Sequence, residues 1–345
     1  MTTDSAKRAP EMANDRGIPP SLGHRLFNLG THYGLLVLFA VVVVFFALYS
    51  QTSTAYLSQA NLVTLLGNNV VVCIVALAVL VTLTAGYIDL SVGAVTGVSS
   101  LVVAGAVGND HISMAIAIPL AIVVGMLLGL LNGFLIARFH LSSIVTTLGM
   151  STALSGVMLW YTKGSTIGSQ LPQSLLNFGS LNWFGIPRVT YVMIPIVLVC
   201  WFVLENTPFG RYLQAIASNS RSSRLVGINV DRSVLSAFIF SGFLAGVAGA
   251  LLTARSGAAD ATTGPSYLFL ALAGVFLGAT TIHPGRPNVW GTVVGIFFVA
   301  FVNSGLSLLG ARAWAPDLFN GLILVIAAGL ASIFARRRGG GPRLL

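Results

Sequence analysis

The chain has 345 residues, of which 55% are hydrophobic and only 8% are charged, and its mean hydropathy is +0.89. Soluble domains carry about 25% charged residues, so this composition excludes an ordinary soluble enzyme or binding module and predicts that lipid covers most of the surface. The net charge of +9 does not indicate a nucleic-acid partner, because the basic residues lie between apolar segments, as in membrane proteins.

Apolar segments recur along the chain after a polar N-terminal region, and each is close to the roughly 20 residues that cross a bilayer as a helix. We expect spans at 33–50, 60–82, 89–108, 112–137, 143–161, 189–205, 233–254, 266–282, 288–309 and 316–335. The predicted fold is therefore an all-α polytopic membrane protein with about ten transmembrane helices. An N-terminal tail at 1–32 and a basic C-terminal tail at 336–345 would flank a single transmembrane domain at 33–335.

The basic residues favour one orientation, a multi-pass protein of the cell membrane with both termini in the cytoplasm. With ten spans, 14 of the 18 Lys and Arg residues then lie inside, and the external ones are Lys163, Arg188, Arg255 and Arg312. This asymmetry is the positive-inside pattern. Spans 2–5 and 7–10 would have opposite orientations, which predicts an inverted repeat of the kind common in transporters.

Several kinds of chemistry have no support in the sequence. No phosphate-binding loop with the pattern G-x-x-x-x-G-K-[ST] occurs, and Cys73 and Cys200 lie in apolar runs without metal-ligand spacing. We therefore expect no cofactor and no metal. Carboxylates are nearly absent from the span interiors, whereas proton- or sodium-coupled carriers use them; this argues for an energy source outside the chain.

Three motifs stand in separate parts of the chain. Residues 85–93 read AGYIDLSVG, residues 207–232 read TPFGRYLQAIASNSRSSRLVGINVDR, and residues 277–295 read LGATTIHPGRPNVWGTVVG. Over residues 60–335 the chain resembles the ribose/xylose/arabinose branch of ABC importer permeases, whose members carry similar motifs in this order. It departs from them at Arg221 and Arg224, and at Ala279, His283, Pro284 and Pro287.

The resemblance implies a transport subunit without its own ATPase site, which forms the pathway for a small sugar. The implied partners are a cytosolic ABC ATPase subunit, an extracytoplasmic sugar-binding protein and a second permease copy, in a homodimer or a heterodimer. A permease for branched-chain amino acids or nucleosides is the nearest alternative, although IDLSVG favours sugar. An ATP-independent secondary transporter is a further alternative.

The segment from Thr207 to Arg232 is the longest cytoplasmic connection, and apolar residues recur within it. Gly227 is expected to end a short amphipathic helix there. Such a helix can lie on the lipid surface or insert into a groove of a partner, and the resemblance favours a groove on the ATPase. The candidate ATPase-coupling residues are Tyr212, Ile216, Asn219, Arg221, Arg224, Leu225, Gly227, Ile228 and Asn229.

Polar side chains within or beside the spans are candidates for the solute pathway. They are Asn68, Asn69, Asp89, Ser91, Asn132, Thr146, Thr147, Asn303 and the adjacent Ser304. Because an unpaired amide facing lipid costs several kcal/mol, these groups must face protein or water, and hydrogen bonding between helices is the alternative to solute contact. Asp89 can also cap the third span by accepting from the backbone N–H groups of residues 90–92.

Overall fold

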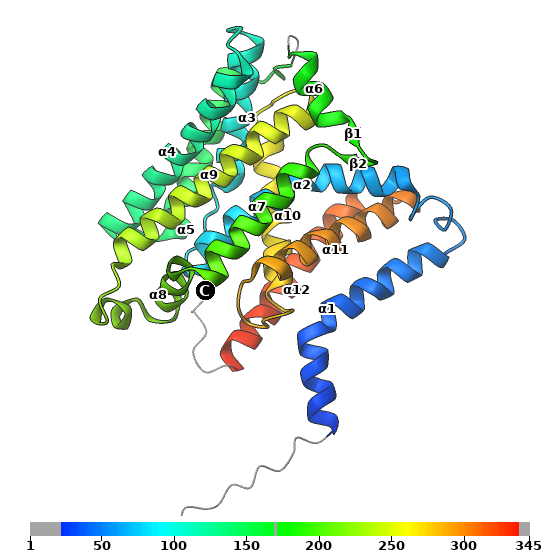
Figure 1. The fold of residues 1–345 in the computed structure, drawn as a ribbon, viewed down its shortest axis with the longest axis vertical. Helices are drawn as coiled ribbons and strands as arrows, with labels where there is room; N and C mark the ends of the chain where they lie inside the picture. Colours follow the sequence, from blue (N-terminus) through cyan, green and yellow to red (C-terminus); the bar gives the residue numbers. More distant parts are fainter. Residues whose placement is uncertain (1–21, 169–170, 338–345) are drawn as a thin grey trace, which may run out of the picture.

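Helices make up nearly all of the fold (Figure 1). The structure is a computed structural model that describes residues 22–168 and 171–337. Side chains are described within residues 33–334. Their bounds are α1 Leu22–Leu48, α2 Gln59–Thr84, α3 Val92–Gly108, α4 Met114–Phe139, α5 Ser143–Thr162, α6 Gln173–Ser180, α7 Thr190–Trp201, the π-helix η1 Phe202–Asn206, α8 Pro208–Leu225, α9 Val230–Ser256, α10 Thr263–Gly278, α11 Val289–Leu308 and α12 Trp314–Arg337. Strands β1 Asn182–Trp183 and β2 Ile186–Pro187 form a short antiparallel hairpin.

The length and composition of these helices suit a bilayer. Six helices of the described chain are long and apolar enough to cross one, namely α2, α4, α5, α9, α11 and α12. Three shorter apolar helices are α3, α10 and the part of α1 from Tyr33 to Leu48, and α7 with η1 is bent by 63° against α8. The predicted all-α polytopic membrane protein is confirmed at this level.

Polar side chains set several helix starts, as the sequence allows. Ser58, Asn229 and Asn288 each accept a hydrogen bond from the backbone N–H three residues later, at the starts of α2, α9 and α11. Such caps satisfy donors that the first helical turn leaves free. Gly257, with φ at +68°, ends α9 in the left-handed conformation that favours glycine.

Helix α9 runs through the centre of the molecule and packs against α2, α3 and α4 (Figure 1). From Val70 to Thr84 every residue of α2 is buried, as expected of a helix that is apolar all round. Cys73 and Cys200, which lie in apolar runs of the sequence, are buried free thiols.

Glycines allow the closest helix crossings. A Cβ on Gly125 would collide with the Gly242 carbonyl oxygen, and one on Gly129 would collide with the Phe238 carbonyl oxygen. Helices α4 and α9 therefore approach backbone to backbone at these small residues. The same kind of contact joins α10 to α11, where Gly278 faces Gly291.

The structure differs from the expected elements in two places. Helix α1 begins at Leu22, inside the tail expected at 1–32; the rest of that tail and residues 338–345 lie outside the described residues. Helix α6 and the hairpin were not expected, because their sequences are too short and too polar to register as spans. The bend at Thr207 agrees with the expected end of the sixth span at 205: Pro208 starts α8 there, and Gly210 packs against the Leu204 backbone so closely that no Cβ fits.

Candidate translocation cavity and coupling segment

Amide and hydroxyl side chains gather in a cavity of about 290 Å³ between α2, α10 and α11. Its lining residues are Asn61, Thr64, Leu65, Asn68, Asn69, Val72, Leu270, Ile296, Val299, Ala300, Asn303, Ser304 and Ser307. The structure thus brings together Asn68, Asn69, Asn303 and Ser304 from the predicted pathway set. None of the lining residues is ionisable, so the cavity presents neutral hydrogen-bonding groups on apolar walls.

Two amide side chains of this cavity use their nitrogen atoms in hydrogen bonds to the protein, which leaves their oxygen atoms as acceptors. Asn69 Nδ2 donates to the Leu65 carbonyl oxygen at 2.8 Å, and Asn303 Nδ2 donates to Asn320 Oδ1 at 3.0 Å. Asn303 Oδ1 is buried and accepts no hydrogen bond from the described part of the chain. Since a buried acceptor without a partner is costly, a ligand hydroxyl that donates to this atom would be stabilised.

A third amide has the opposite orientation. Asn68 Oδ1 accepts from Arg255 Nη2 at 2.8 Å and from Arg255 Nε at 3.2 Å, which leaves its Nδ2 to donate. Nearby, Ser304 Oγ donates to Asn61 Oδ1 at 3.0 Å, so this part of the wall is held by its own hydrogen bonds. A wall that both donates and accepts suits a ligand with several hydroxyl groups, because each hydroxyl can do both.

Four other predicted pathway residues form a separate buried network. Asp89 Oδ1 accepts from Ser91 Oγ at 2.6 Å, and Asn132 Nδ2 donates to the same Ser91 Oγ at 2.8 Å. Thr147 Oγ1 accepts from the Leu90 backbone N–H at 3.0 Å. The network joins α3, α4 and α5 near the start of α3 and does not line the cavity, whereas Thr146 belongs to neither group.

The capping role expected of Asp89 needs correction in one respect. The residue at the N-cap of α3 is Ser91, and Asp89 lies two positions earlier, where its Oδ1 accepts from the Ser91 backbone N–H at 2.9 Å. Asp89 therefore stabilises a turn that leads into α3 rather than the first turn itself. Asp89 is 3% exposed, and the extended stretch around it explains why simple capping spacing misplaced it.

The predicted coupling segment is helix α8 and the connection to α9, at the end of α9 opposite to α6 (Figure 1). Ile216 packs with Val230, Val234 and Phe238 of α9. A Cβ built on Gly86, in the connection from α2 to α3, would lie 3.3 Å from Ala217 Cα. One face of α8 is thus fixed to the transmembrane core.

The expected single helix consists of two pieces. Asn219 has extended backbone angles, φ −161° and ψ 100°, inside α8. Its side chain accepts from the Ser222 backbone N–H at 3.0 Å, so it starts a new turn that carries Arg221 and Arg224. Helix α8 ends before Gly227, whose φ is +87°, as predicted. Asn residues favour such local bonds over a continuous helix.

The outward face of this segment is apolar as well as basic. Leu225 is 85% exposed and Val226 is 77% exposed, and Tyr212 is also exposed. Arg224 forms an ion pair with Asp231 at 2.6 Å, and Asn229 caps α9 by accepting from the Arg232 backbone N–H. Ile228 packs against the cluster around Ile216. Exposed apolar side chains next to charged ones are typical of a protein-binding surface.

Two residues that depart from the family pattern, His283 and Pro287, line a second polar cavity of about 220 Å³ beside α8. Its lining residues are Glu205, Gln214, His283, Arg286, Pro287 and Asn288. Asn288 Nδ2 donates to three backbone carbonyl oxygens, those of residues 278, 281 and 286, and thereby holds the loop before α11. Ala279 is the C-cap of α10.

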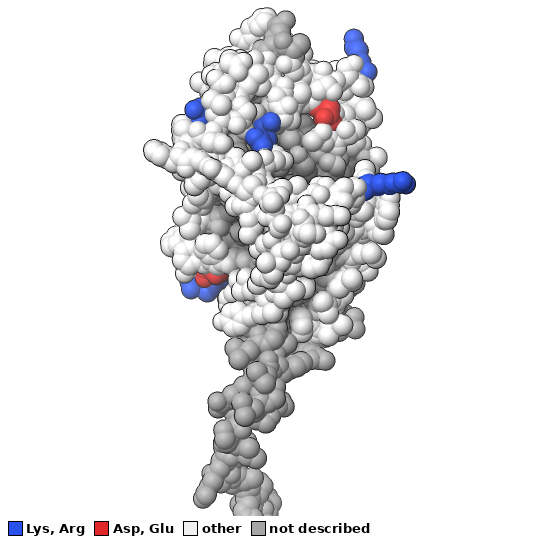
Figure 2. Space-filling view, turned by 90° about the vertical axis from the view of Figure 1, so that its right-hand side faces the viewer, with Lys and Arg blue, Asp and Glu red and all other residues white. Residues whose placement is uncertain are grey.

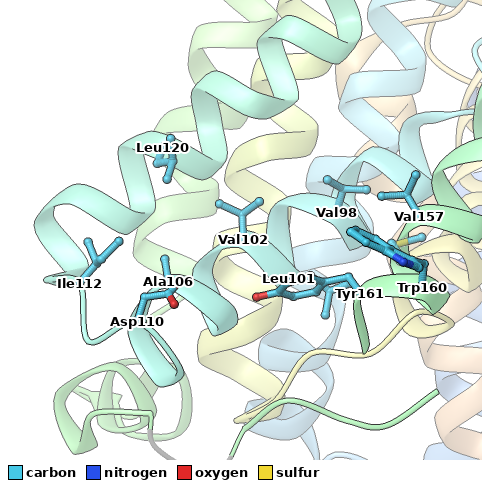
Figure 3. Close-up of a pocket in the computed structure, with 11 residues that line it drawn as sticks. Val98, Leu101, Val102, Ala106, Asp110, Ile112, Leu120, Val157, Trp160 and Tyr161 are labelled. Atoms are coloured by element: carbon cyan, nitrogen blue, oxygen red, sulfur yellow. The ribbon is translucent and has the colours of Figure 1, made fainter. Parts of the chain in front are cut away.

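A third cavity, of about 320 Å³, lies between α3, α4 and α5 and has mostly apolar walls (Figure 3). Trp160 and Tyr161 come from α5, Val98 and Val102 from α3, and Asp110 is its one carboxylate. Such walls offer few partners for a hydroxylated solute. Lipid acyl chains suit them better, because α5 and α4 also expose many apolar side chains.

The surface supports this placement in lipid. Figure 2 shows a face that is almost entirely uncharged, with few Lys, Arg, Asp and Glu side chains. Large exposed apolar side chains are frequent on α1, α4, α5 and α12. Fold and surface together define the class: an all-α, multi-pass membrane protein with a polar cavity between its helices.

Comparisons with known proteins identify the family. A family model described as "Branched-chain amino acid transport system / permease component" matches residues 61–328. The ribose import permease protein of Escherichia coli (strain K12) is 32% identical over 85% of this chain and 90% of its own length. The corresponding protein of Bacillus subtilis (strain 168) is 32% identical over 87% and 91%, and the fructose import permease protein of Rhizobium meliloti is 30% identical over 92% and 89%.

The chain belongs to this family of ABC importer permeases, within the sugar-permease branch that its motifs indicated. It is thus a transport component and a multi-pass protein of the inner membrane. No solved structure matches it.

Proposed function

We propose that this chain forms the route of a small neutral sugar through an ABC importer, and that the cavity between α2, α10 and α11 is part of that route. The observation that carries the proposal is the cavity's lining, with amide and hydroxyl groups, no ionisable side chain and an unpartnered acceptor at Asn303 Oδ1. Relatives named for ribose and fructose import support the same class of solute.

The alternatives fit the cavity less well. An amino acid carries an ammonium and a carboxylate group, and burying either without an opposite charge is costly, yet the lining offers no charge. A nucleoside is larger and carries an aromatic base, for which the lining holds no aromatic partner. A secondary transporter would use an intramembrane carboxylate, but Asp89 is already bonded to Ser91.

Uptake by a reconstituted complex tests the solute class. The chain, its ATPase and its binding protein in vesicles should take up ribose or fructose on addition of ATP, and should not take up leucine. Uptake of leucine in preference to both sugars would contradict the proposal. ATP-independent uptake by the purified chain alone would establish a secondary transporter.

The energy source is a separate cytosolic ATPase, which binds α8 and the residues that follow it. Support comes from the exposed side chains of Leu225 and Val226, and from the packing of Ile216 against α9, which holds α8 on the transmembrane core. The chain has no phosphate-binding loop, so the purified chain should neither bind nor hydrolyse ATP. An extracytoplasmic sugar-binding protein delivers the solute at the opposite side.

The topology that we propose has ten spans with both termini in the cytoplasm. The six long helices, the three shorter apolar ones and α7 with η1 make ten, which leaves α8 in the cytoplasm. Cysteines introduced one at a time by Ser220→Cys and Ser256→Cys should react from opposite sides, cytoplasmic and external respectively. Reaction of both from one side would contradict this topology.

The inverted repeat has support in the packing. Helix α3 packs against α4, α5 and α9, and α10 packs against the equivalent set α11, α12 and α2. Asp89 and Asp260 each accept from a backbone N–H and a hydroxyl two residues later, just before α3 and α10. The two short helices meet where Gly264 packs on Gly97.

A second permease copy, identical or related, completes the pathway. The outer face of α5 carries Gly149 and Gly156, which have no atoms within 4 Å of a Cβ position, and the exposed Thr152 between them. Small and hydroxylated residues are the ones that let membrane helices approach each other. Disulfide cross-linking between two Thr152→Cys copies would support this contact. If no position on this face of α5 forms a cross-link, the contact is wrong.

A further inference from the structure

Helix α6 and the β1–β2 hairpin form a cap over one end of α2 and α9 (Figure 1). Gly179 of α6 packs against the Ala254 backbone so closely that no Cβ fits, and a Cβ on Gly67 of α2 would lie 3.4 Å from Pro187 of β2. The hairpin tip carries Trp183 and the fully exposed Phe184. The cap therefore touches both helices and leaves an aromatic tip free.

Arg255, near the end of α9, joins this cap to the polar cavity. Its Nη1 donates to the Gly179 carbonyl oxygen at 2.9 Å, while Nη2 and Nε donate to Asn68 Oδ1 at 2.8 and 3.2 Å. One guanidinium group thus bridges α6, α9 and α2. Its acceptors are both neutral, and no carboxylate pairs with it among the described residues.

The bond to Asn68 determines what that residue presents to a ligand. An amide can turn over and exchange its oxygen with its nitrogen, because the two ends are similar in size. With Oδ1 held by two guanidinium donors, Nδ2 remains as the donor for a ligand. Asn69 and Asn303 present oxygen atoms instead. Arg255 therefore fixes the orientation of the Asn68 amide, which offers a donor where these two offer acceptors.

We infer that Arg255 is a positioning residue, which fixes the Asn68 amide for the sugar and links that orientation to the external cap. The guanidinium fork suits this role, because its planar donors reach two acceptors at once, which a Lys ammonium on a flexible stem does less well. A binding protein that docks on the cap would displace Gly179 and Asn68 together. The inference rests on the proposed sugar route for its cavity part, but its cap part stands on the Arg255 contacts alone.

The test compares Arg255→Gln and Asn68→Asp in the complete complex with ATPase and binding protein. Arg255→Gln removes the bridge, whereas Asn68→Asp keeps an acceptor for Arg255 and removes the donor toward the ligand. We expect Arg255→Gln to raise the binding-protein concentration for half-maximal ATPase stimulation about tenfold. Asn68→Asp should leave that concentration unchanged and lower sugar uptake about tenfold.

Controls separate this role from a general loss of structure. Arg312→Gln removes another exposed external cation, and should change neither measurement. Where Arg255→Gln yields too little assembled complex, Arg255→Lys is measured instead. It keeps the charge but not the guanidinium fork, so its binding-protein response should be weaker than that of the wild type but not lost. An unchanged binding-protein response in both Arg255 variants would overturn the inference.

The two proposals fail in different ways. If Asn303→Leu and Asn68→Asp leave uptake unchanged while Arg255→Gln weakens the binding-protein response, the cavity is not the sugar route but the cap link holds. If both Asn variants lower uptake and Arg255→Gln has no effect on either measurement, the sugar route holds and the positioning role is wrong.

Discussion

The polar cavity and the coupling segment present opposite kinds of chemistry. Amide and hydroxyl groups line the cavity between α2, α10 and α11, and Asn303 Oδ1 has no hydrogen-bond partner among the described residues. On the coupling segment, apolar side chains turn outward, with Leu225 and Val226 more than three-quarters exposed. The first arrangement complements a small polar solute and the second a protein surface, so each region displays the chemistry of its proposed partner.

The largest expected effect lies on the coupling segment. Replacing Leu225 and Val226 together by Asp should abolish ATPase association, because central interface contacts can each be worth about 2–4 kcal/mol. Co-purification of the ATPase with the membrane-inserted chain measures this. Ser220→Asp, an exposed polar site on the same segment, is the matched control. Normal association of the double variant would mean that this surface is not the docking site.

The next effect lies in the cavity. Asn303→Leu removes the free acceptor and should lower ATP-driven sugar uptake about tenfold, since a lost hydrogen bond of about 1–1.5 kcal/mol corresponds to that factor. ATPase association should not change. Ser307→Ala, at the exposed edge of the same cavity, should have little effect. Equal uptake by the wild type and Asn303→Leu would place the route elsewhere.

A smaller effect concerns the turn before α10. Partial burial would raise the pKa of Asp260, but hydrogen bonds from Thr263 and Thr262 outweigh it and lower the pKa to about 2, from a usual 3.8. Because the folded pKa is depressed, this carboxylate stabilises the fold fully above pH about 4 and loses that contribution as pH falls toward about 2.

Melting temperatures of the purified chain, measured across this range, test the Asp260 prediction. The wild type should exceed Asp260→Ala at pH 6, and the difference should shrink as the pH falls toward 2. A difference that stays constant with pH would show that the charge of Asp260 does not contribute.

The smallest effect concerns the ion pair of Arg224 and Asp231, whose side chains are 48% and 47% exposed. Exposed pairs contribute about 0–1 kcal/mol, so Arg224→Ala should barely change the melting temperature. Arg224→Glu should instead weaken ATPase association, if charge on this segment guides docking. A large loss of stability in Arg224→Ala would contradict this separation.

Much of this account follows from sequence, and the misses have physical reasons. The lengths of the apolar segments predicted the long helices, and Gly227 correctly predicted the end of α8. Both signals are local, because they depend only on neighbouring residues of the sequence. Asn68, Asn69 and Asn303 were recognised as polar groups in apolar surroundings. Their separation from the Asp89 network depends on which helices meet, and Arg255 was missed because its partners lie 187 and 76 positions away.

Chemical labelling of Ser307→Cys, at the exposed edge of the cavity, in the assembled importer tests the central claim most directly. The native Cys73 and Cys200 are buried, so the introduced thiol can be followed by itself. With binding protein and ATP present, ribose or fructose should slow the reaction of this thiol with a small polar reagent, while leucine should not. An unchanged rate at Ser307→Cys, together with sugar protection of Thr152→Cys on the outer face of α5, would contradict the claim that the sugar passes through this cavity.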